Sequence, residues 1–438
     1  MGLPRRGGAG RRRRRVAGAA RCGAPRAAGG RRRAGLISTP AGGAGGSARP
    51  GDSTIGGERG RGVSLPREGV MRRACLGALV LLAAALTAAC GSDRKVVGVV
   101  LPESGVNKGY GASLQAGVKL AFDEAIAKGS PSGFEAQYRD SLSHPEYAAK
   151  ECAELFKGGA LIVIGGATSS EAKAMIPEAE KARKVIISPS ASEPDLAASS
   201  NLFFRTVPSD EFEGLVAADF LVQEKKARTV MILFEEGLYA DGMLPVFTRE
   251  VEKLGAKVVG KLAIGPTDWD KTIGDALTTV KPDSVFICAY GEEILGALTV
   301  VRGVKYAGTV CAVSAIATGD FVRRAGALAE GVFVPMVTID LTSSKEPIAS
   351  FVKRFKAAHN GAMPDLFAAY GYDAALVALD ALHGPPPKDT SELLVRIMSL
   401  GNEQGVTGKL AFDKDGNIDH HPSMHVIRDG KIVELQAS

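Results

Sequence analysis

The stretch ALIVIGGATSSEA (residues 160–172) carries the pattern that decides the fold: an unbroken apolar run, two glycines, and hydroxyl residues that open a helix. Such a run is typical of a strand covered on both faces, as in a parallel sheet. Parallel sheets bind ligands beyond the carboxyl ends of their strands, beside helix N-termini. Because Gly165 and Gly166 let the backbone approach closely and the first helical amides are unpaired, this turn predicts an anion site suited to a carboxylate. No Gly-Lys-Ser/Thr follows, so the turn is not a phosphate loop.

The alternation of strand and helix continues along the chain from this stretch. Short apolar runs recur, separated by segments whose apolar residues return at spacings of three and four. This alternation implies parallel sheets with helices on both faces and right-handed crossovers. The sequence therefore predicts an α/β protein with two doubly wound parallel sheets, one in each of two lobes. The run 203–208 is expected to lead the chain out of the first lobe. The predicted strands are 96–101, 134–140, 160–166, 184–190, 228–234, 256–264, 283–290, 309–314 and 331–338.

Helices are predicted between these strands and after the last of them. Two of the later helices, 347–359 and 364–382, are expected to return to the first lobe. Two closing strands are predicted at 408–413 and 424–435, the second folding into a hairpin at Asp429-Gly430. The other predicted helices are 114–125, 145–157, 170–183, 210–224, 240–254, 269–279, 291–302, 319–326 and 391–400.

An export signal is predicted upstream of the first strand. Met71 is followed by two arginines and by 16 uncharged residues, 74–89, which end in small residues before Cys90. This run is shorter than the roughly 20 residues of a membrane-spanning helix, which disfavours a span. It has the basic, apolar and small-residue regions of a secretory signal. LTAAC (86–90) resembles the signal of bacterial lipoproteins, which implies cleavage before Cys90 and a lipid on its sulfur, followed by a tether, 90–95.

Residues 1–70 contain 16 Arg, no Lys and 19 Gly, with no apolar periodicity. Such a segment cannot bury enough surface to fold, so we interpret it as a disordered extension and Met71 as the true start. An arginine-rich arm that binds nucleic acid is the alternative, but it would precede an export signal and has no aromatic residue for stacking. The whole chain carries +6; since residues 1–89 hold +15, residues 90–438 carry −9. That charge gives no case for nucleic-acid binding.

The sequence after Cys90 shows no sign of a metal, a cofactor or catalysis. Its cysteines, at 152, 288 and 311, lack metal-ligand spacing and are expected to be buried thiols. No Gly-x-Ser-x-Gly, His-Glu-x-x-His or Gly-x-Gly-x-x-Gly motif occurs there. An unspecific hydrolase-like enzyme is the alternative, but we expect a binding protein without enzymatic activity. The histidines at 420, 421 and 425 are predicted to lie at the surface.

Six segments occur in the order seen in a known family. They are VVGVVLPESGVNKGYGASLQAGVKLAFDEA, LIVIGGATSS, ISPSASEPDL, FFRTVPSD, AAYGYDAALVALDAL and GVTGKLAFDKDGN. Over 95–435 the chain resembles type I periplasmic binding proteins, specifically the branched-chain amino-acid-binding family of ABC importers. The resemblance implies two lobes joined by three crossovers, near 206–209, 335–338 and 408–416. Lobe I then comprises 96–208 plus 338–410, and lobe II comprises 209–337 plus 411–438.

The resemblance also implies a ligand site between the lobes. Ser169, beside Thr168 in the ATSS segment, falls where the family receives the ligand's carboxylate. Ser190 and Ser192 fall in the segment that supplies a backbone carbonyl and a hydroxyl. The family's aromatic residues fall on Tyr110 and, after the strand at 283–289, on Tyr290.

One position departs from the family pattern. Amino-acid binders of this family place a glutamate after the next strand to pair the ligand's ammonium, and this sequence has Ser314 there. A buried ammonium without a charged partner is costly. Three alternatives remain open: Glu292 substitutes, tyrosine faces hold the charge by cation–π contact, or the ligand has no ammonium.

The expected function is capture of a small carboxylate-bearing ligand, such as a branched-chain amino acid, by hinge closure. The expected partners are that ligand, an ABC permease, and the membrane through the lipid on Cys90, with the protein a monomer on the extracytoplasmic side of the cell envelope. A sensory module that signals to a membrane receptor is the alternative, and neighbouring permease and ATPase genes would separate the two.

Overall fold

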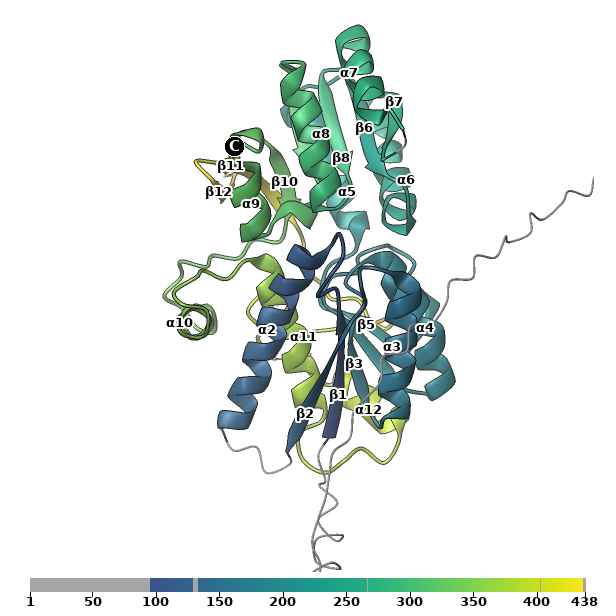
Figure 1. Ribbon diagram of the computed structural model, residues 1–438, viewed down its shortest axis with the longest axis vertical. Helices are drawn as coiled ribbons and strands as arrows, with labels where there is room; N and C mark the ends of the chain where they lie inside the picture. The colour runs from purple at the N-terminus through teal and green to yellow at the C-terminus, as the bar shows by residue number, and fades with distance from the viewer. Residues whose placement is uncertain (1–94, 129–132, 266, 402, 436–438) are drawn as a thin grey trace, which may run out of the picture. The chain divides into compact units, whose positions relative to one another are not determined.

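The computed structural model describes residues 95–435, apart from 129–132, 266 and 402. The predictions for the extension 1–70, the signal 71–89 and the lipidated Cys90 lie outside these residues. The predicted tether reaches into the first strand, because Lys95 already pairs with Phe134. Two sheets, each with its own helices, make up the described chain (Figure 1).

The first sheet has five strands in the order β2-β1-β3-β4-β5, and all of its pairings are parallel. Its central strands are almost wholly buried, as their unbroken apolar runs predict. The parallel order brings every carboxyl end to one edge of the sheet. The strands are β1 (Lys95–Leu101), β2 (Phe134–Asp140), β3 (Ile162–Gly165), β4 (Val185–Ser188) and β5 (Phe203–Arg205).

Helices cover both faces of the first sheet. Alternate residues of a strand point to opposite faces, so Val99 joins the core that contains Leu114, whereas Val100 joins the core that contains Met175. Leu114 belongs to a helix that packs beside another from far along the chain (Figure 1). These two helices are α2 (Lys108–Ala127) and α11 (Leu366–Ala381), and those on the other face are α3 (Pro145–Lys157) and α4 (Ser169–Ala182).

Glycines allow α2 and α11 to pack with their backbones in contact. A Cβ at Gly117 of α2 would stand 1.8 Å from the carbonyl oxygen of Ala368. A Cβ at Gly371 of α11 would stand 2.1 Å from the carbonyl oxygen of Leu114. Both distances are far below van der Waals contact, so only glycine fits at either position.

The second sheet has seven strands in the order β12-β11-β10-β9-β8-β6-β7. The five strands from β10 to β7 in this order are parallel, and the hairpin of β11 and β12 adds to the edge in antiparallel fashion. The predicted turn at Asp429-Gly430 forms that hairpin, both residues having positive φ. The strands are β6 (Thr229–Glu235), β7 (Lys257–Ile264), β8 (Ser284–Cys288), β9 (Thr309–Ala312), β10 (Phe333–Met336), β11 (Ser423–Arg428) and β12 (Lys431–Glu434).

The remaining helices follow the predicted pattern with adjusted ends. The helix predicted over 210–224 is α-helical only as far as Asp219 and continues as a π-helical segment, Phe220–Glu224. Its α-helical part, α5, packs against α6, β10 and β11. The helices are α5 (Asp210–Asp219), α6 (Leu238–Lys253), α7 (Trp269–Val280), α8 (Gly291–Gly303), α9 (Gly319–Ala325), α10 (Ile348–Ala358) and α12 (Thr390–Met398).

Two predictions near the C-terminus are wrong. No strand forms over 408–413; this segment makes only isolated bridges, such as Gln404 with Lys409. Asp413 instead folds the following residues into a turn by accepting hydrogen bonds from the backbone N–H groups of Asp415 and Asn417. Of the three histidines expected at the surface, those at 420 and 425 are buried, with hydrogen bonds to backbone carbonyls.

Within residues 95–435 and outside the gaps named above, no helix combines the length and apolarity that crossing a membrane requires.

Candidate ligand-binding site

The turn after β3 forms a helix N-terminus with an unusual division of roles between neighbouring hydroxyls. Thr168 is the N-cap of α4: its Oγ1 accepts a hydrogen bond from Glu171 N at 3.2 Å, and the Glu171 carboxylate accepts one from Thr168 N at 3.1 Å. Ser169 is the first helical residue, 1% exposed, and its Oγ accepts a weak bond from Glu193 N at 3.3 Å. Because Thr168 does the capping, the donor capacity of the Ser169 hydroxyl is left for another partner.

The loop after β4 packs directly onto this turn. Ser188 Oγ donates to the carbonyl of Gly166 at 2.9 Å, and Ser190 Oγ donates to the carbonyl of Ala167 at 2.7 Å. Ser192 belongs to the same loop, and its carbonyl accepts a bond from Asp210 N at 2.8 Å. The predicted serines at 169, 190 and 192 therefore lie in one connected loop pair at the carboxyl edge of the first sheet.

The predicted tyrosines meet across the two sheets. Tyr110, expected in a loop, lies in the first turn of α2, and its ring centroid is 6.1 Å from that of Tyr290 at the start of α8. Tyr239 of α6, which the sequence did not single out, has its ring 5.2 Å from Tyr290. Burial raises the pKa of all three phenols, so they are neutral hydrogen-bonding groups at physiological pH.

Tyr290 also reaches the N-terminus of α4. Burial and the neighbouring Tyr110 raise the pKa of Tyr290, whereas a hydrogen bond with the backbone of Ser169 lowers it in part. The phenol from the second sheet thus lies at the helix end that belongs to the first. The Ser169 hydroxyl and the positive end of the helix dipole can receive an anion here.

Ser314 is bound to a carboxylate that the sequence reasoning missed. Its backbone N–H donates to Glu213 Oε1 at 2.6 Å, and its hydroxyl donates to Glu213 Oε2 at 2.8 Å. Glu213 lies on α5 and is 7% exposed. Burial raises the pKa of Glu213 to about 7, although the two hydrogen bonds from Ser314 oppose the shift.

Asp210, one turn before Glu213, is buried without a partner. It is 1% exposed, and neither carboxylate oxygen makes a hydrogen bond of ordinary geometry to any described residue. Burial and the charge of Glu213 raise the pKa of Asp210 well above its usual value; the Ser192 hydroxyl and the Arg205 charge lower it only in part. The guanidinium of Arg205 is itself bound to the side chain of Asn417 and the carbonyl of Glu193.

Glu292, one of the expected alternatives for holding an ammonium, is already paired. Both of its carboxylate oxygens accept hydrogen bonds from the guanidinium of Arg324, at 2.5 and 2.7 Å, and this pairing lowers its pKa. The pair lies beside a shallow surface hollow whose lining includes Tyr110 from α2 and Phe321 from α9. Glu292 therefore lies at the margin of the group formed by the other predicted residues.

Asp210 and Glu213 could have been found from the sequence by their spacing. They are three residues apart and share one face of the predicted helix 210–224, the face that must also bury apolar residues such as Ala217. Acidic residues on a core-facing stripe are rare unless they have a partner.

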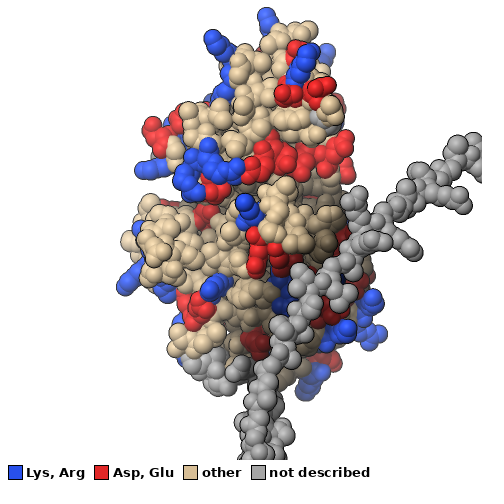
Figure 2. Space-filling view, viewed as in Figure 1, with Lys and Arg blue, Asp and Glu red and all other residues tan. Residues whose placement is uncertain are grey.

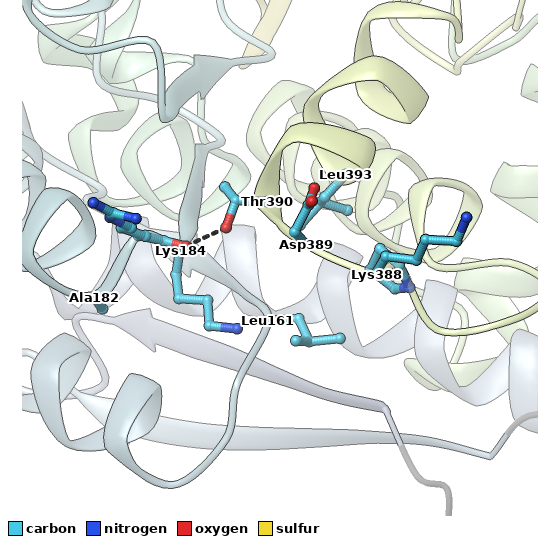
Figure 3. A pocket seen from close by; sticks show the side chains of 9 residues that line it. Leu161, Ala182, Lys184, Lys388, Asp389, Thr390 and Leu393 are labelled. Carbon is cyan, nitrogen blue, oxygen red and sulfur yellow. Dashed lines mark hydrogen bonds between the residues drawn. The ribbon is translucent and has the colours of Figure 1, made fainter.

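A second hollow, of about 520 Å³, lies elsewhere on the first sheet (Figure 3). Its lining includes Leu161 and Lys184, which directly precede β3 and β4, together with Thr390, whose hydroxyl bonds to the carbonyl of Arg183. It is therefore at the amino edge of the strands, opposite the loops that carry Ser169 and Ser190.

The chain belongs to the family of periplasmic binding proteins, whose pattern matches residues 96–436. It is 23% identical over 359 residues to a leucine-, isoleucine-, valine-, threonine- and alanine-binding protein of Pseudomonas aeruginosa, covering 80% of this chain and 94% of that protein. It is 25% identical over 337 residues to the Leu/Ile/Val-binding protein of Escherichia coli K12, covering 75% of this chain and 89% of that protein. The expected family is confirmed.

Solved structures share the fold. The branched-chain amino acid transporter substrate-binding protein LivJ from Streptococcus pneumoniae, in complex with isoleucine, has a TM-score of 0.71 at 23% identity, covering 77% of this chain and 97% of LivJ. An ABC transporter solute-binding protein from R. palustris, in complex with benzoate, has a TM-score of 0.72 at 20% identity, covering 78% of this chain and 95% of that protein. The predicted α/β class with two mostly parallel sheets is confirmed.

Proposed function

We propose that this protein is the extracytoplasmic solute-binding component of an ABC importer and captures a small amino acid without chemical turnover. The observation that carries the proposal is the N-terminus of α4, where the buried hydroxyl of Ser169 donates to no described residue and lies beside Tyr290 of the other sheet. A carboxylate fits this helix end. The relatives in Pseudomonas aeruginosa and Escherichia coli are leucine-, isoleucine- and valine-binding proteins, which suggests the ligand class.

The proposed mechanism is closure of two lobes over the ligand. Lobe I comprises 96–208 plus 338–410 and carries Ser169, Ser190 and Ser192; lobe II carries Tyr290 and Ser314. A ligand held by both sets of residues binds the closed form better than the open form, and this difference in affinity favours closure. A permease that recognises the paired lobes then distinguishes loaded from empty protein.

Membrane attachment through Cys90 belongs to the same proposal. A lipid on this cysteine would hold the protein near its permease, with the acyl chains contributing about 0.8 kcal/mol for each buried CH₂ group. The described face carries basic and acidic side chains interspersed rather than a basic stripe, which agrees with a small-molecule ligand rather than a nucleic acid (Figure 2).

The test of the proposed function is ligand binding measured by calorimetry with leucine, isoleucine, valine, alanine and threonine, and with carboxylates that lack an amine. We expect Ser169→Ala to weaken every ligand that the unaltered protein binds by about 10- to 100-fold, because each loses a hydrogen bond to its carboxylate. Ser399→Ala is the matched control, since that hydroxyl donates to a backbone carbonyl within α12 and its neighbouring turn, far from Ser169 in the chain. Binding of none of these compounds by the unaltered protein would overturn the proposal.

A further inference from the structure

The carboxylate expected beside the ligand's amine is present, but it comes from a different element. In amino-acid binders of the resembled family the loop after this strand supplies it, and here that position is Ser314. Ser314 directs both its backbone N–H and its hydroxyl to Glu213, at 2.6 and 2.8 Å. The loop's own residue, Ser314, has no carboxylate, but the carboxylate of Glu213 from α5 lies next to it.

We propose that Glu213, supported by Asp210, receives the ligand's ammonium, so that the site selects compounds with a primary amine beside the carboxylate. This inference rests on the proposed function, because it takes the carboxylate of the same ligand to lie at Ser169. It goes beyond the proposed function, since it assigns the amine to a pair of acids on α5.

Glu213 keeps the capacity to bind a cation. A carboxylate has about four acceptor positions, and the two bonds from Ser314 occupy one on each oxygen. An ammonium has three donors, which can be shared between Glu213, Asp210 and the phenol oxygens nearby. Faces of aromatic rings also favour an ammonium.

Asp210 supplies independent support. It is 1% exposed, and the nearby Ser192 hydroxyl makes no bond of ordinary geometry to either of its oxygens, whereas a buried acid of purely structural role is normally well hydrogen-bonded. Its charge raises the pKa of Tyr110, Tyr239 and Tyr290, so it lies close enough to these three phenols to act on them electrostatically. An amine that enters between these rings meets Asp210 and Glu213 together.

No basic side chain of the described residues bonds directly to Asp210 or Glu213. Asp210 and Glu213 bring two carboxylates, and Arg205, the one cation whose charge favours the ionised form of Asp210, is bound to Asn417 and to the carbonyl of Glu193. Glu292 cannot supply the missing contact because it is paired with Arg324. An ammonium relieves the unpaired buried charge, whereas a ligand without one leaves it to proton uptake.

The groups that face Glu213 determine how its protonation responds to a ligand. They are Asp210 on α5, Tyr110 on α2, Tyr239 on α6, Tyr370 on α11, Cys288 on β8 and Cys311 on β9. Burial holds the thiols and phenols neutral, so only the two carboxyls change charge near neutral pH. Binding of an ammonium favours their ionised forms and releases protons.

The experiment compares isoleucine with 3-methylpentanoate, the same carboxylate without its amine, by calorimetry at pH 6.5 in buffers of different ionisation enthalpy. Three proteins are compared: the unaltered chain, Glu213→Gln, and Glu211→Gln, whose exposed side chain lies on the same helix. We expect Glu213→Gln to weaken isoleucine by about 30-fold or more and to reduce the protons released, while 3-methylpentanoate changes less than about twofold. Glu211→Gln should match the unaltered protein.

Each outcome separates the inference from the function on which it rests. Equal affinity of Glu213→Gln and the unaltered protein for isoleucine overturns the inference and leaves amino-acid capture intact. Binding of 3-methylpentanoate but not isoleucine overturns it as well, while carboxylate capture stands. Binding of neither compound, nor of the other amino acids, overturns the proposed function itself. If thermal unfolding shows that Glu213→Gln is not folded, Asp210→Asn takes its place in the comparison. The same loss of affinity is then expected for isoleucine and not for 3-methylpentanoate.

Discussion

Two buried aspartates of this protein show how a carboxylate with a structural role differs from one that awaits a ligand. Asp373 of α11 is fully buried and accepts three hydrogen bonds, from Val406 N, Thr407 N and the Thr407 hydroxyl. Those bonds hold its pKa at about 6 against the effect of burial. Asp210 is buried to almost the same degree, but no described residue bonds to it with ordinary geometry, and the Ser192 hydroxyl lowers its pKa only in part. The contrast shows that the buried carboxylate with unused hydrogen-bonding capacity is the one on α5.

The raised pKa of Glu213 predicts that the ligand-free protein becomes more stable as the pH falls from 8 to 6.5. The native carboxyl takes up a proton near pH 7, whereas the unfolded one stays ionised down to its ordinary value of 4.5. The native state thus binds more protons, and the free energy of unfolding rises as the pH falls, by roughly 1 kcal/mol or less from this group. Chemical denaturation at pH 8, 7 and 6.5 measures the slope.

Glu213→Gln should flatten that slope, and Glu211→Gln should keep it. Below pH 6.5 two histidines have the opposite effect on the free energy of unfolding. Burial lowers the pKa of His420 and of His425, so the unfolded state takes up protons that the native state does not, and stability falls with pH. A slope that is unchanged in Glu213→Gln would show that Glu213 does not titrate in this range.

Residue by residue, the structure connects the loops of the predicted serines and adds a buried pair of carboxylates that was not predicted. Ser169, Ser190 and Ser192 were predicted from strand ends and from the resemblance, and the structure connects their loops by hydrogen bonds. Glu213 was missed because its role depends on Ser314, which is about a hundred residues later and adjacent only in the folded chain. The contact itself leaves no local pattern, although the spacing of Asp210 and Glu213 on a core-facing stripe does.

At the scale of elements, apolar runs and spacing predicted nearly every strand and helix, some to the residue. β2 (Phe134–Asp140) and α3 (Pro145–Lys157) have the predicted bounds. The segment 408–413 has a strand-like sequence but no neighbouring strand with which to pair over its length, and Gly408 has a φ of +140°. Strand propensity without a partner does not make a strand.

The contact of α2 and α11 gives a prediction that compares two helical glycines. Gly117→Ala should lower the free energy of unfolding by about 1–3 kcal/mol or more, because its methyl group would overlap the backbone of Ala368. Gly274→Ala in α7 should raise it by about 0.5–1 kcal/mol, since its methyl group meets only side chains of Val300 and Val304 at 3.4 Å or beyond and alanine favours helix. Urea denaturation of both variants tests the pair; equal effects would contradict the close packing.

At the scale of the whole molecule, closure over a ligand should protect one edge of the first sheet and leave the other unchanged. Hydrogen–deuterium exchange of the full chain should slow on ligand binding at 168–172 and at 290–294, where α4 and α8 begin. The amides at 158–161 and 182–184, at the amino edge near the hollow of Figure 3, serve as the internal control. Equal change at both edges would contradict ligand capture at the carboxyl edge.

The overall architecture could be predicted because both sheets have strong, repeated strand–helix signals, and the order of six segments pointed to the family. The position of Asp210 and Glu213 relative to the serines could not be predicted, because it depends on how α5 packs against the loop after β4. Asp210 N bonds to the carbonyl of Ser192, and this single contact places the start of α5 against the other sheet. The lobe boundaries at 208, 337 and 410 stay predictions.

The late arrival of α11 beside α2 also constrains how the chain acquires its structure. A ribosome makes Leu114 about two hundred and fifty residues before it makes Gly371, whose backbone touches Leu114 in the finished protein. Until then α2 lacks its neighbouring helix on that face of the first sheet, and closing so long a loop is slow. The packing of that face can therefore be completed only after most of the chain has been synthesised.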